Sequence, residues 1–187
     1  MELRSNNAVQ ILAAAFDKNL SVNDTIKQDD RREARITALM NYAVELGQRS
    51  NGLHFSNDGH SVAVCFDPSQ SKGGLSATLA QLKLVHRAIG WKRALYMMRK
   101  DKAISSRRPA YPHYYLMLIG TDPQHHGKGS GSQLLDTLLQ TAAKEGKEVY
   151  LETSVDKNIP FYEKRGFAVF DTWLVREGYL IRFMKSI

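Results

Sequence analysis

Three glycines in the segment Gly120–Ser132 have the type and spacing of a phosphate-binding loop. Gly127, Gly129 and Gly131 lie between an apolar run that is typical of a strand and an apolar periodicity that is typical of a helix. Glycine lets a ligand approach the backbone closely, and a helix N-terminus offers free N–H groups and a partial positive charge. The segment therefore predicts either a phosphate site or a tight strand-to-helix turn without a ligand.

The spacing of these glycines excludes two common nucleotide-binding loops. The P-loop requires Gly-Lys followed directly by Ser or Thr, whereas Lys128 is followed by Gly129. The dinucleotide-binding fingerprint requires unequal glycine spacing, whereas these three glycines are evenly spaced. The pattern Gln124-x-x-Gly127-x-Gly129 resembles instead the pyrophosphate loop of the GNAT superfamily of acetyl-CoA-dependent N-acetyltransferases.

A second segment, Val149–Phe167, carries the same resemblance. It predicts a short strand and then a short helix that ends at Gly166. In the GNAT family an Asn near the start of this helix touches the pantetheine arm, a Tyr faces the acetyl-CoA sulfur, and a Gly-Phe pair begins the next strand. In this sequence those places are taken by Asn158, Tyr162, Gly166 and Phe167.

More narrowly, Leu-Glu-Thr-Ser at 151–154 and Asn-x-Pro-Phe-Tyr-Glu at 158–163 resemble the puromycin N-acetyltransferase-like branch, whose members acetylate small amines. The resemblance is strong over residues 113–172 and weak before them. It implies the α+β GNAT (acyl-CoA N-acyltransferase) fold, in which a central mixed, mostly antiparallel twisted sheet is flanked by helices.

Length and composition agree with a single such domain over 1–187, with an acceptor-side half at 1–112 and an acetyl-CoA-binding half at 113–187. No apolar run approaches the roughly 20 residues that span a bilayer. The apolar stretch of a secretory signal is missing, and its place is taken by Glu2, Arg4, Ser5, Asn6 and Asn7. Cys65 is the single cysteine, so no internal disulfide can form. We expect a cytoplasmic enzyme without a membrane partner, and we leave a homodimer open.

The chain is basic, with 26 Lys and Arg against 19 Asp and Glu. The basic residues cluster only modestly, at 92–102 and at Arg107-Arg108, and they lack the aromatic interleaving or zinc spacing of nucleic-acid-binding modules. We therefore expect solvated helix faces and no nucleic-acid partner. A polyanionic cofactor such as coenzyme A, steered by exposed Lys and Arg, is a second sufficient explanation.

The resemblance also implies the contacts of acetyl-CoA, the expected co-substrate. Backbone N–H groups of Leu118 or Ile119 would hold the oxyanion, and the loop would hold the pyrophosphate. The residues expected to bind acetyl-CoA are Leu118, Ile119, Gln124, His125, His126, Gly127, Lys128, Gly129, Ser130, Gly131, Asn158 and Tyr162. Two of them depart from the usual sequence motif of the family. Ser130 stands where an aliphatic residue is usual, and His126 stands where Gln is frequent. Ser130 has two open roles, a helix cap and a hydrogen bond to phosphate.

Acetylation of an amine needs a group that accepts a proton and a group that gives one to the leaving thiolate. Tyr162 is the candidate acid, because a phenol keeps its proton at neutral pH; the alternative is an aromatic side chain packed beside Phe161. Glu152 and His113 are the candidate bases, since partial burial would raise the pKa of Glu152 and a histidine already titrates near neutrality. The alternatives are a structural or amine-binding carboxylate for Glu152, a strand-end histidine bonded to backbone for His113, and a water relay.

We expect no metal site in this chain. Adjacent histidines such as His125 and His126 diverge on a turn, and no carboxylate or cysteine stands at ligand spacing from them or from His113.

The sequence therefore predicts an N-acetyltransferase that moves acetyl from acetyl-CoA directly to a primary amine, favoured to be a small molecule, in a ternary complex. Residues 10–60, which are expected to line the acceptor pocket, carry no recognisable motif. Two alternatives stay open, a protein or peptide N-acetyltransferase and a non-catalytic acyl-CoA-binding module.

The elements that must position these residues follow from apolar periodicity and from turn signals. Helices are predicted at 9–16, at 36–46 and at 75–98, the last divided by Gly90. The other predicted elements are a hairpin over 53–66 that turns at Asp58-Gly59, a loop at 68–74, a polar connection at 101–112, a strand at 114–119 and terminal strands at 167–173 and 179–184. No clear strand precedes Val9, so the opening strand is missing, displaced, or formed by Met1–Arg4.

Overall fold

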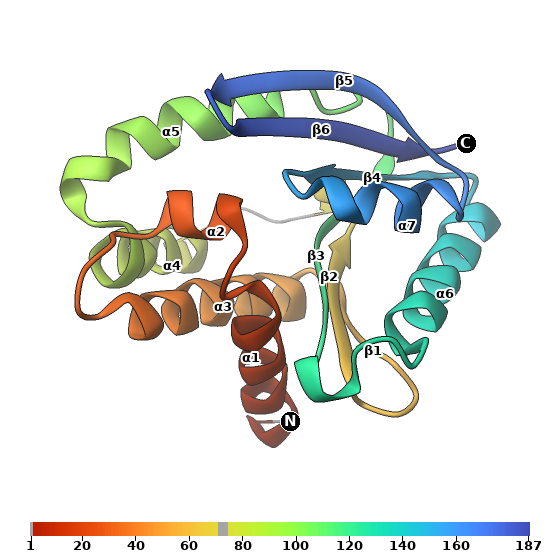
Figure 1. Cartoon of the computed structure of the whole chain (residues 1–187), viewed down its shortest axis with the longest axis horizontal. Helices are drawn as coiled ribbons and strands as arrows, with labels where there is room; N and C mark the ends of the chain where they lie inside the picture. Colours follow the sequence, from red (N-terminus) through yellow and green to blue (C-terminus); the bar gives the residue numbers. More distant parts are fainter. Residues whose placement is uncertain (1, 71–74) are drawn as a thin grey trace.

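The computed structural model describes residues 2–70 and 75–187 and shows one six-stranded sheet flanked by helices (Figure 1). The strand order is β1-β2-β3-β4-β6-β5, and neighbouring strands are antiparallel except for β3 and β4, which are parallel. The strands are β1 Leu53–Phe55, β2 Ser61–Phe66, β3 His113–Thr121, β4 Glu148–Thr153, β5 Phe167–Arg176 and β6 Tyr179–Ser186. The predicted mixed, mostly antiparallel sheet is confirmed.

Helices cover both faces of the sheet, and Figure 1 shows α1 and α3 on the side opposite to α6. The helices are α1 Glu2–Phe16, α2 Leu20–Thr25, α3 Arg32–Arg49, α4 Leu75–Leu84, α5 Trp91–Ser105, α6 Ser130–Lys144 and α7 Ile159–Glu163. Of the helices that the structure describes, none is both long and apolar enough to cross a membrane.

Two apolar clusters, one on each face, hold these layers together. On the face covered by α1 and α3, the buried members include Leu12, Met40, Val64, Tyr150 and Phe183. On the face covered by α6 and α7, they include Leu116, Leu135, Leu138, Leu151 and Tyr162. Side chains alternate between the faces of a strand, so consecutive residues such as Tyr150 and Leu151 belong to different clusters.

The first element of the described chain is the helix α1. Glu2–Arg4 form the first turn of α1, so the idea that they make an opening strand is wrong. Among the described residues no strand precedes Leu53. The short helix α2 has no counterpart among the predictions, because its six residues are too few for a periodicity; it begins after Asn19, whose side chain accepts a hydrogen bond from the Val22 N–H.

The helical stretch after residue 75 is divided at Gly90, as expected. A π-helical turn, Val85–Ile89, precedes this glycine, and α5 follows it. The polar connection predicted at 101–112 is wrong in its first part, because α5 continues to Ser105. Ile104 packs against the core, and Lys100 donates a hydrogen bond to Asp24 at 2.6 Å, so this part of the helix is anchored rather than free.

The predicted hairpin is confirmed as β1 and β2. Its turn contains Gly59 at φ 74°, a conformation that favours glycine. After β2, Pro68–Gln70 form a 3₁₀ turn, and the remainder of the predicted loop, 71–74, lies outside the described residues.

Candidate active site

The parallel strands β3 and β4 pair over only three residues and then separate. His113, Tyr114 and Tyr115 pair with Glu148, Val149 and Tyr150, and no pairing follows between the rest of β3 and the end of β4. Backbone N–H and C=O groups on the facing edges are therefore available to an extended ligand that lies between the strands. This opening, which we call the wedge, lies directly before the glycine loop.

A β-bulge lies on β3 beside the wedge. Val64 pairs with Leu118 and Cys65 pairs with Leu116, so Met117 is an extra residue in β3. A bulge re-aims the backbone groups around it. Leu118 and Ile119, the residues expected to hold the oxyanion, follow the bulge directly and line the cavity described below. Their role in holding the oxyanion stays a prediction.

The glycine loop has the backbone geometry that only glycine adopts easily. Gly127 has φ 82° and Gly129 has φ 89°, and a Cβ added at Gly131 would lie 2.8 Å from Thr121 Oγ1. Gly129 is the N-cap of α6 and has no side chain to cap the helix, so N–H groups of the first turn are left for a ligand. Residues 126–129 are exposed. These features suit an anion at the N-terminus of α6.

Ser130 is not the cap of α6, because that position belongs to Gly129. Its hydroxyl is buried and faces the β1–β2 hairpin. Its Oγ lies 2.7 Å from Ser61 Oγ and 2.9 Å from both Ser56 Oγ and Asp58 Oδ1. These contacts hold the start of α6 against the hairpin and occupy the hydroxyl that was one candidate ligand of phosphate.

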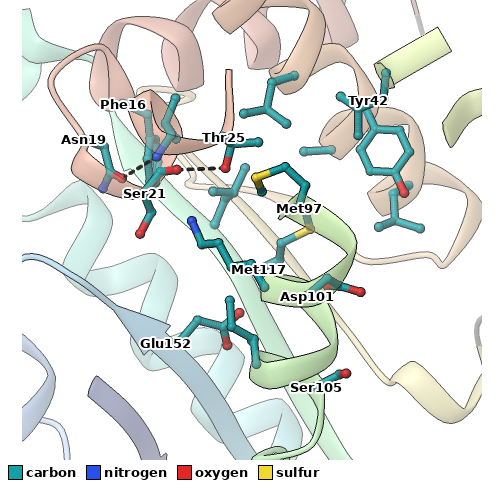
Figure 2. Close-up of a pocket in the computed structure, with 18 of the residues that line it drawn as sticks. Phe16, Asn19, Ser21, Thr25, Tyr42, Met97, Asp101, Ser105, Met117 and Glu152 are labelled. Carbon is teal, nitrogen blue, oxygen red and sulfur yellow. Dashed lines mark hydrogen bonds between the residues drawn. The ribbon is translucent and has the colours of Figure 1, made fainter. Parts of the chain in front are cut away.

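A cavity of about 1000 Å³ joins the wedge to the acceptor-side helices (Figure 2). Asn158 and Tyr162 line it where α7 meets the wedge, and Met117 and Glu152 line it from the strands. Side chains of α2, α3, the π-helical turn and α5 line the remainder, and these include Thr25, Leu39, Tyr42, Val85, Met97 and Asp101. The cavity is therefore shared by the two predicted halves of the chain.

Glu152 has one engaged and one unengaged carboxylate oxygen within this cavity. Oε1 accepts a hydrogen bond of 2.5 Å from the Tyr115 hydroxyl and lies 3.6 Å from Arg108 Nη2. Oε2 is buried and has no hydrogen-bond partner among the described residues. Burial raises the pKa of Glu152 above its ordinary value, while the Arg108 charge and the Tyr115 hydroxyl act in the opposite direction. A carboxylate in this setting is suited to accept a proton near neutral pH.

Tyr162 lies on α7 and lines the same cavity as Glu152. It is 7% exposed, and its ring makes edge contacts with Phe161 and Phe167. Burial raises the pKa of its phenol to about 12, so the hydroxyl keeps its proton at neutral pH. Tyr162 therefore both packs beside Phe161 and lines the cavity. Neither observation conflicts with a role as proton donor.

His113 lies away from the cavity that Glu152 and Tyr162 line. It is 7% exposed, its Nδ1 lies 2.8 Å from the Tyr111 carbonyl oxygen, and its ring makes an edge contact with Tyr150. This contact matches one of the two alternatives stated for His113, namely a histidine at the end of a strand that bonds to the backbone.

The loop side chains lie in different environments. His126 and Lys128 are exposed, and so is Gln124. The ring of His125 stacks on that of His60, with centroids 3.4 Å apart, and its Nδ1 lies 3.5 Å from Asp122 Oδ2. A carboxylate therefore does stand close to His125, and the expectation that none does is wrong; His113, at the other end of β3, is far from this group.

Sequence reasoning missed the partners of Glu152. Tyr115 and Glu152 point to the same face because Tyr115 pairs with Tyr150, two residues before Glu152. Arg108 was noted only as part of a basic pair, yet its Cζ lies 4.1 Å from the centre of the Tyr115 ring. Tyr115 belongs to the continuous apolar run that predicted the strand, and Arg108 follows α5. No spacing in the sequence indicated that either residue contacts Glu152.

Comparison with known proteins connects this geometry to one family. Residues 87–167 match the model of the family described as the Acetyltransferase (GNAT) family. The match spans the glycine loop, the wedge strands and α7. It begins at residue 87 and so does not include α2 and α3, which line part of the cavity.

Solved structures with the same fold cover the whole chain. A Corynebacterium glutamicum protein named histone acetyltransferase HPA2 and related acetyltransferase is 21% identical, with a TM-score of 0.72 over 100% of this chain and 92% of its own. Arylalkylamine N-acetyltransferase 2 of Aedes aegypti is 12% identical, with a TM-score of 0.63 over 100% and 95%. A Pyrococcus horikoshii protein is 14% identical, with a TM-score of 0.55 over 98% and 90%.

These structural similarities cover the whole chain, whereas the family model matches only residues 87–167. The six-stranded mixed sheet, the separation of β3 from β4 and the loop before α6 occur in a chain whose solved structural neighbours are acetyltransferases. The chain therefore has the GNAT fold, and its residues 87–167 match the model of the GNAT acetyltransferase family.

Proposed function

We propose that the protein transfers acetyl from acetyl-CoA to the primary amine of a small molecule, directly and in a ternary complex. The observation that carries this proposal is the single cavity that Tyr162, Glu152 and the acceptor-side helices share. Donor and acceptor can meet there without a covalent intermediate, because a base and a proton donor line the same space. In this scheme residues 1–112 supply the acceptor side and 113–187 bind acetyl-CoA.

The chain's own residues suit each part of acetyl-CoA, which supplies the thioester. The exposed glycines and the uncapped start of α6 offer N–H groups to the pyrophosphate. The free edges of β3 and β4 suit the pantetheine arm, and Asn158 lines the cavity where that arm would end. The N–H groups of Leu118 or Ile119 are the proposed donors to the oxyanion, and the bulge at Met117, which re-aims the backbone beside them, supports this assignment.

Glu152 is the proposed base. The amine must lose a proton before or as it attacks, and Oε2 of Glu152 is the unengaged acceptor at the cavity. Tyr115 and Arg108 hold Oε1 and thereby orient the carboxylate. Tyr162 is the proposed acid that gives its proton to the leaving thiolate. His113 is placed away from this path, so we do not assign it a step.

The lining of the acceptor side favours an amine on an apolar body. Leu39, Tyr42, Met97 and Met117 contribute apolar surface, and Asp101 adds a carboxylate beside them (Figure 2). Polar side chains, among them Lys100 and Ser105, also line the cavity, and apolar walls with polar groups set among them are typical of small-molecule sites. The motif wording at 151–163 supports a place in the puromycin-like branch, and a cytoplasmic location goes with that proposal.

Acetyl-CoA binding tests the donor half of the proposal. Acetyl-CoA should raise the melting temperature of the wild type and of Gly146→Ala, but not of Gly129→Ala. Both glycines have positive φ, at 65° and 89°, and open space around them, so the two substitutions carry comparable backbone strain. Only Gly129 lies at the start of α6. Absence of a shift in the wild type at saturating acetyl-CoA would overturn the proposal.

A screen for thiol release tests the acceptor half. The panel should contain arylalkylamines, polyamines, aminonucleosides and short peptides, each with acetyl-CoA. Turnover with a small amine supports the proposal, and turnover with peptides alone replaces it with a peptide N-acetyltransferase. Binding of acetyl-CoA without turnover of any amine would indicate a non-catalytic acyl-CoA-binding module.

A further inference from the structure

Three metal-ligating side chains gather at the end of the sheet, outside the cavity described above. His60 precedes β2, Asp122 follows β3, and His125 lies in the 3₁₀ turn Pro123–His125 that leads into the glycine loop. We call them the His60–Asp122–His125 cluster. Their backbones are fixed relative to one another, because the Asp122 N–H donates to the His60 carbonyl at 2.9 Å and the His125 N–H donates to the Asp122 carbonyl at 2.8 Å.

The donor atoms of the cluster converge. One ligand atom from each of the three side chains lies within 4.8 Å of the other two. The imidazole rings of His60 and His125 stack nearly parallel, at 10° and with centroids 3.4 Å apart. His125 Nδ1 is buried and makes no hydrogen bond among the described residues, although Asp122 Oδ2 lies 3.5 Å from it.

Asp122 can serve the cluster without losing its structural role. Its Oδ1 accepts a hydrogen bond of 3.0 Å from the Gln124 N–H and so caps the 3₁₀ turn. Its Oδ2 is the oxygen that lies near His125. All three side chains are half-buried. Coordination of one ion requires the stacked rings of His60 and His125 to turn so that a nitrogen of each faces the ion.

We propose that this cluster binds one divalent transition-metal ion of the Zn²⁺ class. Two imidazole nitrogens and one carboxylate oxygen form a ligand set that zinc uses, with water in the fourth position. Tetrahedral bonds of about 2.0–2.1 Å place neighbouring ligand atoms roughly 3.3 Å apart, and His125 Nδ1 lies at a comparable 3.5 Å from Asp122 Oδ2. Mg²⁺ and Ca²⁺ prefer oxygen ligands and are poorly matched to two imidazoles.

The ion would join two segments that are far apart in sequence. His60 belongs to the hairpin, whereas Asp122 and His125 belong to the connection between β3 and the glycine loop. A bound ion would therefore hold the entry of that loop against the hairpin and stabilise the folded chain, because the unfolded chain does not present the three ligands together. The proposal does not depend on the acetyl-transfer reaction.

The test is metal binding to the purified chain without a histidine tag, after treatment with a chelator. Zn²⁺ is titrated in competition with a chromophoric chelator, and Co²⁺ is used as a spectroscopic substitute. The wild type should bind one ion with a dissociation constant in the micromolar range or below, and Zn²⁺ should raise its melting temperature. His60→Gln, His125→Gln and Asp122→Asn should each weaken binding at least tenfold; Asp122→Asn keeps the oxygen that caps the 3₁₀ turn.

His126→Gln is the matched control, since His126 is an exposed neighbour of His125 in the same loop. It should bind the ion as the wild type does and show the same rise in melting temperature. Equal binding by the wild type and His60→Gln would overturn the proposal, because it would assign the ion to scattered surface histidines. Binding weaker than millimolar in the wild type would overturn it as well.

Discussion

Arg108 places its guanidinium 3.6 Å from the carboxylate of Glu152 at the wall of the cavity. Two opposing influences therefore act on the pKa of Glu152. Burial raises the pKa of the carboxyl group, and the positive charge of Arg108 lowers it. The net pKa lies above the ordinary value for glutamate, so the Arg108 charge limits a shift that burial alone would make larger.

Arg108→Gln should therefore move the acidic limb of the kcat/KM profile to higher pH. Loss of the guanidinium removes an interaction that favours the carboxylate, so Glu152 stays protonated over a wider range and is inactive as a base there. Arg108→Lys keeps the charge and should leave the limb closer to that of the wild type. The measurement is the pH dependence of thiol release. An acidic limb unchanged in Arg108→Gln would contradict Glu152 as the base.

Tyr162→Phe should lower kcat by about 100-fold or more, because a general acid typically contributes 10²–10⁴-fold. The ring and its contacts with Phe161 and Phe167 are retained, so acetyl-CoA should still raise the melting temperature. Tyr42→Phe removes another phenol that lines the same cavity and should keep kcat within about threefold. Steady-state kinetics with one amine separates the two variants. Equal kcat in Tyr162→Phe and the wild type would refute the acid assignment.

Ser130→Ala should reduce the free energy of unfolding by about 1–3 kcal/mol, since it removes a buried hydroxyl that hydrogen-bonds to three side chains of the hairpin. Ser130 is 2% exposed and contacts Ser56, Asp58 and Ser61. Gln133→Ala, at an exposed position of the same helix, should change the unfolding free energy by no more than about 0.5 kcal/mol. Urea unfolding at pH 7 measures both. A Ser130→Ala variant as stable as the wild type would show that the network contributes nothing.

The same network has a pH signature. The Ser56 hydroxyl, then the His60 N–H and the Ser130 hydroxyl, lower the pKa of Asp58 to about 2. Because the pKa of Asp58 is lower in the folded chain than in the unfolded chain, its carboxylate contributes to the free energy of unfolding. That contribution is fully present above the ordinary pKa near 4 and is lost as the pH falls toward 2. Ser130→Ala removes one donor, so the loss of unfolding free energy between pH 6 and pH 3 should be smaller than in the wild type.

The donor side of the site was predictable because its signals are local. Gly127 and Gly129 have the positive φ that their type indicated, and the strand and helix around them follow from continuous apolar patterns. The short helix that carries Tyr162 was predicted for the same reason, because its sequence motif lies within a few residues. The role of Tyr162 as an acid stays a prediction. Such short-range signals survive folding because neighbouring residues largely determine the local backbone.

The acceptor side was not predictable, because long-range contacts build it. Helix α2 is six residues long, and Asp24 and Arg108 acquire their roles from partners far away in the chain. His60 and His125 likewise meet only because β2 and β3 are paired. No spacing in the sequence records which separated residues a sheet will bring together.

Asp24 links three elements and supplies the last prediction. It accepts hydrogen bonds from Lys100 at 2.6 Å, from Arg176 at 2.6 Å and from Tyr96 at 3.0 Å, and so joins α2 to α5 and to the end of β5. The side chains of Asp24 and Lys100 are 4% and 5% exposed. Burial acts to raise the pKa of Asp24, but the Lys100, Arg176 and Tyr96 contacts outweigh it, and the net pKa is lowered.

Asp24→Asn should destabilise the chain by about 3–5 kcal/mol, because it leaves the buried Lys100 ammonium without its anion. The double variant Asp24→Asn/Lys100→Met removes that charge and should recover part of the loss. Arg176→Ala is the control within the same cluster, since a side chain that is 51% exposed makes a pair worth only about 0–1 kcal/mol. Urea unfolding at pH 7 ranks the three variants. Equal stability of Asp24→Asn and Arg176→Ala would contradict the idea that the buried Asp24–Lys100 pair holds α5 against α2. Helix α5 carries Met97 and Asp101, which form part of the cavity wall.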